Sequence, residues 1–232
     1  NGLSSANITA TAVTAISGNA SDLNTLVGNE GTASNKVDLK GDVAITLSAT
    51  EGTTYTILKA LMDATTGNVD AQNITKITGT RTLVASLIAA EGSDGNEIDL
   101  DSDFAVTLTE TTQTASVLNT FNGTVPGLID ATSVTALSGT AADLDTLVGQ
   151  EGTTGNKVDL KSDVAITVND GTTTAAELAR ITAITTANVT STAVAAISGT
   201  ATEMNTLAGL EGTDAGEIDL AATVALTITD GT

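Results

Sequence analysis

Aspartate residues at regularly repeated positions are the strongest candidates for chemistry in this sequence. Asp42, Asp103 and Asp163 each follow another aspartate by four residues. Stacked carboxylates repel one another unless a cation or hydrogen-bond donors lie between them, and Ca²⁺ accepts many oxygen ligands in flexible geometry. The repeated positions are Asp38, Asp70, Asp99, Asp130, Asp159 and Asp219, with Thr9 and Thr190 in the two gaps of the series. One interpretation is a row of weak Ca²⁺ sites at Asp38, Asp42, Asp99, Asp103, Asp159, Asp163 and Asp219.

The other interpretation of these aspartates is structural. An Asp side chain after a strand often caps a turn by accepting backbone N–H groups a residue or two further on. Neither the calcium-binding nonapeptide G-G-x-G-x-D-x-U-x nor the EF-hand pattern D-x-[DN]-x-[DN]-G occurs in the chain. We therefore favour turn capping and predict no cofactor other than Ca²⁺.

Composition excludes most other chemistry. The chain has no Cys and no His, so it lacks the residues for a Ser-His-Asp or Cys-His nucleophile, a structural zinc site or haem ligation. Its 8 Lys and Arg against 28 Asp and Glu give a net charge of −20, which argues against a nucleic-acid partner. Carboxylate pairs such as Asp99 and Asp103 could serve glycoside hydrolysis, but a catalytic site needs one copy and these recur. We predict no enzyme, no catalytic residue and no membrane insertion.

An internal repeat of about 60 residues organises the whole chain. Ile16-Ser17-Gly18 returns as Ile77-Thr78-Gly79, Leu137-Ser138-Gly139 and Ile197-Ser198-Gly199, and Val37-Asp38-Leu39 returns in step with it. We predict a single array over residues 1–232 with periods 7–67, 68–127, 128–187 and an incomplete 188–232.

Each period divides into two halves that read as strand, turn and short helix. Val164, Ile166 and Val168 alternate with small or polar residues, which is typical of a strand with one buried face. Helix starts are indicated by the pairs Asn19 with Asp22, Thr140 with Asp143, Thr174 with Glu177 and Thr200 with Glu203. Gly28, Gly149 and Gly209 are expected to end helices in the left-handed conformation.

These features predict an α/β fold: a right-handed solenoid of about eight units of about 30 residues, with a parallel β-sheet along one side. A coil of all 60 residues, with strands on opposite walls, is the alternative. Lys36, Glu97, Lys157 and Glu217 share one repeat position and alternate in sign, which we interpret as control of the stacking register. Thr46, Thr107, Thr167 and Thr227 share another and suggest a surface for ice, glycan or another cell, or simply solvent-facing strand residues.

Two stretches carry a resemblance to a known class of proteins. Thr173-Thr174-Ala175-Ala176-Glu177-Leu178 and the segment 193–213 (AVAAISGTATEMNTLAGLEGT) resemble repeats of very large surface or secreted proteins of cyanobacteria and other aquatic bacteria, often grouped with haemolysin-type calcium-binding or adhesin-like proteins. The resemblance implies an extracellular structural or adhesive array and no catalytic residue.

The sequence as a whole therefore favours a non-enzymatic structural module of an extracellular rod, filament or surface layer. Neither end shows a divergent capping repeat, so we expect the array to associate head to tail or to continue in a longer chain. The acidity and the absence of Cys are typical of a bacterial protein at the cell surface. The alternative function is a Ca²⁺-binding or adhesive or ice-binding module with a cell-surface or glycan partner.

Overall fold

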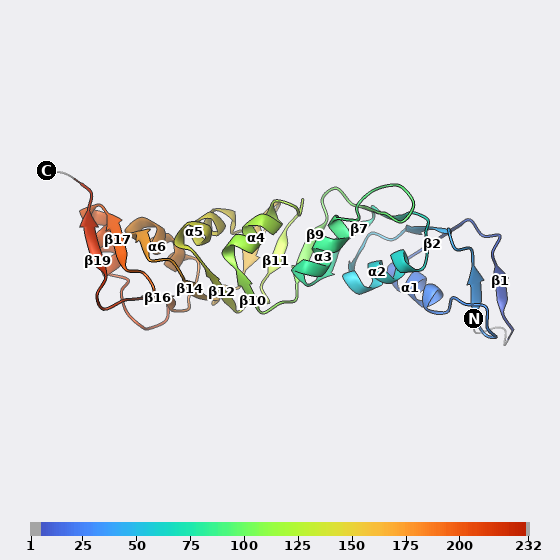
Figure 1. The fold of residues 1–232 in the computed structure, drawn as a ribbon, viewed down its shortest axis with the longest axis horizontal. Coiled ribbons are helices and arrows are strands. Elements are labelled where there is room, and N and C mark those ends of the chain that lie inside the picture. The colour runs from blue at the N-terminus through green and yellow to red at the C-terminus, as the bar shows by residue number, and fades with distance from the viewer. Residues whose placement is uncertain (1–5, 231–232) are drawn as a thin grey trace. The chain divides into compact units, whose positions relative to one another are not determined.

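A computed structural model describes residues 6–230 of the chain. The chain forms two compact parts, one ending at Thr107 and the other beginning at Leu108, and each is described by itself below. Figure 1 shows the order of the elements along the chain.

Strands and short helices alternate through both parts. The first part contains β1 (Ile8–Ala10), β2 (Ala15–Gly18), α1 (Ala20–Gly28), β3 (Val37–Leu39), β4 (Ala44–Leu47), β5 (Glu51–Thr54), α2 (Tyr55–Asp63), β6 (Val69–Ala71), β7 (Ile74–Gly79), α3 (Arg81–Ile88) and β8 (Ile98–Leu100), and β9 (Ala105–Leu108) spans the boundary. The second part contains β10 (Thr112–Thr114), α4 (Ala115–Asn122), β11 (Ile129–Ala131), β12 (Ala136–Gly139), α5 (Ala141–Gln150), β13 (Val158–Leu160), β14 (Ala165–Val168), β15 (Thr172–Thr174), α6 (Ala175–Ala183), β16 (Val189–Ser191), β17 (Ala196–Gly199), α7 (Ala201–Ala208), β18 (Ile218–Leu220) and β19 (Ala225–Ile228).

The α/β class, the parallel strands and the repeated strand–helix order agree with the sequence prediction. We call each set of strands with its following helix a strand–helix unit. Within each part, consecutive helices pack on one another, as α1 does on α2 and α5 does on α4 and α6. These helices have eight to ten residues, which is too short for stability in isolation. Their stability must come from neighbouring units.

Strand pairing follows two alternating patterns. β1 pairs with β3 and β2 with β4, so two consecutive units match strand for strand. Between the second and third units, β4 pairs with β6 and β5 with β7, so the pairing shifts by one strand. We call this shift the slide. The slide occurs because the second unit of each period has an extra strand, which is β5 in the first part and β10 and β15 in the second.

This slide divides the strands among several sheets. In the second part, one sheet has the order β10-β12-β14-β16-β18 and another has β15-β17-β19. The sequence predicts a parallel sheet along one side. That prediction does not include the extra strand, because the threonines at its position are equally typical of a helix cap.

The core consists of aliphatic side chains from strands and helices of neighbouring units. Ile166 and Val168 on β14 are 1% and 0% exposed, as their alternation predicts, and Leu178 and Ile181 on α6 are fully buried. A fully buried aliphatic side chain of this size contributes about 1.5–3 kcal/mol. The repeat therefore obtains its stability from residues that meet across units.

The helices begin at the predicted caps, but their C-terminal ends differ from the prediction. Complete capping boxes form at Thr174 with Glu177 and at Thr200 with Glu203. The Asp143 carboxylate instead accepts from the Thr140 hydroxyl at 2.9 Å, because Asp is one methylene shorter than Glu. Gly209 has a φ of −76°, so the expected left-handed ending is wrong there.

The left-handed residues lie later, in the loop before the next strand. They are Asn35, Asn96, Gly155 and Gly216, with φ between 64° and 79°. Gly28 and Gly149 lie within helices α1 and α5.

Ser191 provides a test of this packing. It ends β16, is 0% exposed, and its hydroxyl has no hydrogen-bond partner among the described residues. Ala71 and Ala131 end the equivalent strands and are also 0% exposed. Ser191→Ala removes a desolvated hydroxyl and should raise the free energy of unfolding in urea by about 1 kcal/mol. Ala71→Ser should lower it, and a destabilised Ser191→Ala protein would contradict the packing described.

Candidate functional site

The repeated aspartates lie on the outward face of the strands. Asp70 is the middle residue of β6 and is half-buried, whereas Val69 and Ala71 on either side are fully buried. Because side chains alternate across a strand, the same pattern holds for Asp99, Asp130 and Asp159 in β8, β11 and β13. We call this set of outward carboxylates the aspartate row.

The aspartate row is made of pairs. Asp70 lies directly opposite Asp99, and Asp130 lies opposite Asp159. The two gap residues are placed as predicted, with Thr9 opposite Asp38 and Thr190 opposite Asp219. On its other side, however, Asp70 faces Thr46 of β4 and no aspartate. The sliding of the strands thus prevents an unbroken row of carboxylates.

Hydrogen-bond donors reduce the repulsion within these pairs. The Gln72 side chain donates to Asp99 at 2.6 Å, and the Gln72 backbone N–H donates to Asp70 at 3.2 Å. The Thr132 N–H and hydroxyl donate to Asp130 at 3.1 and 2.6 Å. The bonds from the Gln72 backbone N–H and from Thr132 are the local turn bonds that the structural interpretation predicts, whereas the Gln72 side chain reaches the aspartate of the next unit.

The second carboxylates of the predicted Ca²⁺ sites have other partners. Asp42 pairs with Lys40 at 3.0 Å and Asp163 with Lys161 at 2.6 Å. The hydrogen bond and charge of each lysine lower the pKa of the adjacent aspartate. Within residues 6–230, no three acidic side chains come close enough to hold a metal ion. The Ca²⁺ sites stay a prediction, and no three of their described carboxylates come together.

Asp103 differs from its two counterparts. The residue directly after the strand is Asp101 where the other two have lysine, and the Asp103 N–H donates to the Asp101 carboxylate at 3.0 Å. Hydrogen bonding and repulsion from Asp101 raise the pKa of Asp103. One substitution in the repeat therefore reverses the direction of the shift.

Hydroxyl side chains lie beside the aspartate row on neighbouring strands of the sheet. Thr167 on β14 lies between Ser138 and Thr190, and Thr190 faces Asp219. The outward face is therefore a mixed row of hydroxyls and carboxylates. A flat surface of threonine alone, as an ice-binding face would need, does not form at these positions.

Contacts between units include a set of residues that the sequence did not single out. The first N–H group of α5, at Ala141, donates to Asp170 of the next unit at 2.9 Å. Ala201 at the start of α7 donates in the same way to Asp230 at 2.9 Å, and Ala20 at the start of α1 donates to Glu51 at 2.6 Å. A carboxylate at a helix N-terminus also interacts favourably with the helix dipole. The recurrence of Asp-Gly at 170 and 230 was the available signal.

Asparagine side chains make a second inter-unit contact. Asn188 donates to the backbone oxygens of Gly212, Asp214 and Glu217, at 3.1 to 3.3 Å, in the loop of the next unit. Asn68 makes the equivalent bonds to Gly92 and Asp94. Backbone oxygens of these two loops are thus satisfied by the unit before them.

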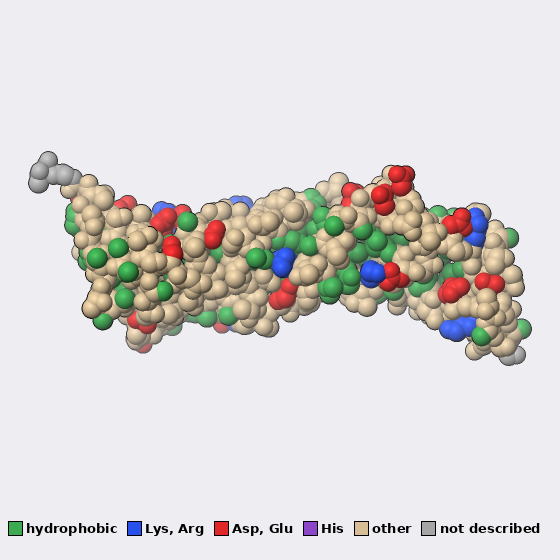
Figure 2. Space-filling model, in the orientation of Figure 1, with side chains coloured by type: hydrophobic (Ala, Val, Ile, Leu, Met, Phe, Trp, Pro, Cys, Tyr) green, Lys and Arg blue, Asp and Glu red, His purple; other side chains and the backbone are tan. Residues whose placement is uncertain are grey.

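The alternating-charge position has local partners. Lys157 donates to the carbonyl of Gly149 near the end of α5 at 2.8 Å, where a cation also favours the helix dipole. Glu217 accepts from the Asp214 N–H at 2.9 Å. Lys157 and Glu217 lie one full period apart in the sequence, so another strand–helix unit separates the two units that contain them. We therefore replace the interpretation as a register-controlling charge row with one of loop and helix capping. Figure 2 shows several basic side chains lying beside carboxylates on one face.

Comparisons with known proteins do not assign a function, so the functional assignment depends on the geometry described above. No family model, curated protein or solved structure matches the chain. Among residues 6–230, the helices are all too short and polar to cross a bilayer.

Removing the Asp170 carboxylate tests the inter-unit helix contact. Asp170→Ala leaves the Ala141 N–H without its acceptor and should lower the free energy of unfolding by about 1 kcal/mol. Asp170→Asn keeps an acceptor and should lose less. Urea denaturation measures both, with the exposed neighbour substitution Asn169→Ala as control. Equal stability of Asp170→Ala and the unmodified chain would contradict the contact.

Calcium removal separates the two interpretations of the aspartate row. If local donors already satisfy the carboxylates, melting temperatures in 5 mM CaCl₂ and in EGTA should agree within about 2 °C. A larger rise with Ca²⁺ that Asp99→Asn diminishes would instead support metal sites.

Proposed function

We propose that this chain is a non-enzymatic structural repeat module that stacks on further units of its own kind to build an extracellular rod, filament or surface layer. The proposal includes winding as a right-handed solenoid of units of about 30 residues, since parallel strands joined through a helix almost always connect with that hand. The repeat makes the same inter-unit contacts several times over. Such redundancy suits a scaffold.

The observation that supports stacking most directly is the exposure of core positions in the outermost units. Leu226 and Ile228 on β19 are 60% and 54% exposed. One period earlier, Ile166 and Val168 on β14 occupy the same positions and are 1% and 0% exposed. A side chain that is core in one copy of the repeat is thus surface in another.

The first unit shows the same contrast. Ile8 and Val13 are 41% and 38% exposed, whereas the equivalent Val189 and Val194 are both 0% exposed. Each of these faces therefore has the composition of an interior and lacks a covering unit among the described residues. Exposed apolar surface of this kind marks an interaction site, and a further unit of the same repeat has the matching shape.

Location outside the cell rests on composition and on the resemblance of the repeats. A charge of −20 keeps such faces from associating too readily, because like charges repel at long range. The alternative of a Ca²⁺-binding or adhesive surface would use the outward aspartate row and not the apolar faces, so the two functions depend on different residues.

Charged substitutions on β19 test the stacking. We expect the unmodified chain to associate as its concentration rises in 150 mM NaCl, and Leu226→Asp with Ile228→Asp to abolish that association without loss of melting temperature. Sedimentation velocity measures association. Thr227→Asp adds a charge on the other face of β19 and serves as control. A chain that stays monomeric at millimolar concentration would contradict the proposal.

A further inference from the structure

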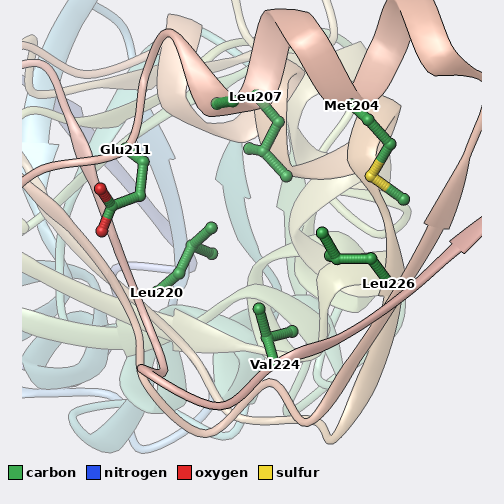
Figure 3. A pocket seen from close by; sticks show the side chains of 7 residues that line it. Met204, Leu207, Glu211, Leu220, Val224 and Leu226 are labelled. Atoms are coloured by element: carbon green, nitrogen blue, oxygen red, sulfur yellow. The ribbon is translucent and has the colours of Figure 1, made fainter.

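A hollow beside α7 gives the stacking face a specific shape. Its volume is about 210 Å³, and its lining is Met204, Leu207, Ala208, Glu211, Leu220, Val224 and Leu226. Figure 3 shows Met204 and Leu207 on α7 opposite Leu220, Val224 and Leu226, with Glu211 at the edge. We call this hollow the α7 socket.

The same socket exists one period earlier, and there it is filled. Leu144, Leu147, Leu160, Val164 and Ile166 correspond to the apolar lining of the α7 socket and are 0% to 5% exposed. The segment that covers them is α6, which packs on α5 and whose Leu178 and Ile181 are fully buried. Just after α6, the Thr185 hydroxyl donates to the Val164 carbonyl at 2.7 Å.

The first part repeats this arrangement. There α2 packs on α1, and Leu58 and Leu61 of α2 are both 0% exposed, at the positions of Leu178 and Ile181. Two sockets of the same design thus hold helices with a large aliphatic side chain at the fourth position and another three residues later.

We infer that the α7 socket binds the helix of a further strand–helix unit with the character of α6: a short threonine strand followed by an amphipathic helix with Leu and Ile three residues apart. This inference rests on the proposed function and identifies the part of the stacking unit that the socket recognises. Recognition follows the helix-in-groove mode, with the two aliphatic side chains as anchors.

One polar contact of the filled socket is absent from the α7 socket. Arg180 of α6 makes two hydrogen bonds to Asp145 of α5, at 2.6 and 2.9 Å. The residue equivalent to Asp145 on α7 is Asn205. Asn205→Asp should therefore tighten binding of a helix that contains Arg180.

A synthetic peptide with the sequence of residues 171–186 is the probe. The chain contains two methionines, Met204 in the socket and Met62 on α2. With ¹³C-labelled methionine methyl groups, the peptide should shift the Met204 signal saturably and leave the Met62 signal in place. Because a helix this short is marginal in water, half-saturation is expected at about 0.1–1 mM.

Two matched variants make the test specific. The peptide with Leu178→Asp should lose the Met204 shift, and Asn205→Asp in the protein should tighten the original peptide about two- to fivefold but not a peptide with Arg180→Ala. An unmoved Met204 signal at 3 mM peptide, or an equal shift with the Leu178→Asp peptide, would overturn the inference. If the chain associates in sedimentation but does not bind the peptide, only helix recognition by the α7 socket is contradicted. If a strictly monomeric chain binds the peptide, only the proposed function is contradicted.

Discussion

Burial between neighbouring strand–helix units is the interaction on which the rest of this structure depends. Strands of three to six residues and helices of eight to ten cannot bury an apolar face alone. Each unit is completed by the side chains of the next, so the parallel register determines which residues form core. Ile166 and Leu226 show this directly, because the same repeat position is core or surface according to whether a neighbour covers it.

The polar contacts between units follow from the same constraint. Stacking brings helix starts and loop carbonyls of one unit close to the next, and buried backbone groups need partners. Asp170 supplies an acceptor to α5, and Asn188 supplies donors to the loop one unit later. These side chains contribute directional bonds to a core of Val, Ile and Leu. They also account for part of the Asp and Asn content of the chain.

Much of the local structure could be predicted because it depends on short-range patterns. The alternation of Val164, Ile166 and Val168 predicted β14, and the pair Thr200 and Glu203 predicted the start of α7. The pairing of Asp70 with Asp99 also followed from the repeat. The sliding of the strands did not, because it depends on whether the threonines of β15 join a neighbouring strand, which no local propensity determines. The partners of Asp42 and Asp163 required side-chain geometry for the same reason.

Stacking of further units on the apolar outermost faces can be tested by hydrogen exchange measured at low and high protein concentration. Stacking requires that amides of β19 exchange fast in dilute solution, that amides of β14 exchange slowly at every concentration, and that β19 becomes protected as concentration rises. Exchange in β19 that is as slow as in β14 when dilute, or equally fast at all concentrations, would contradict it.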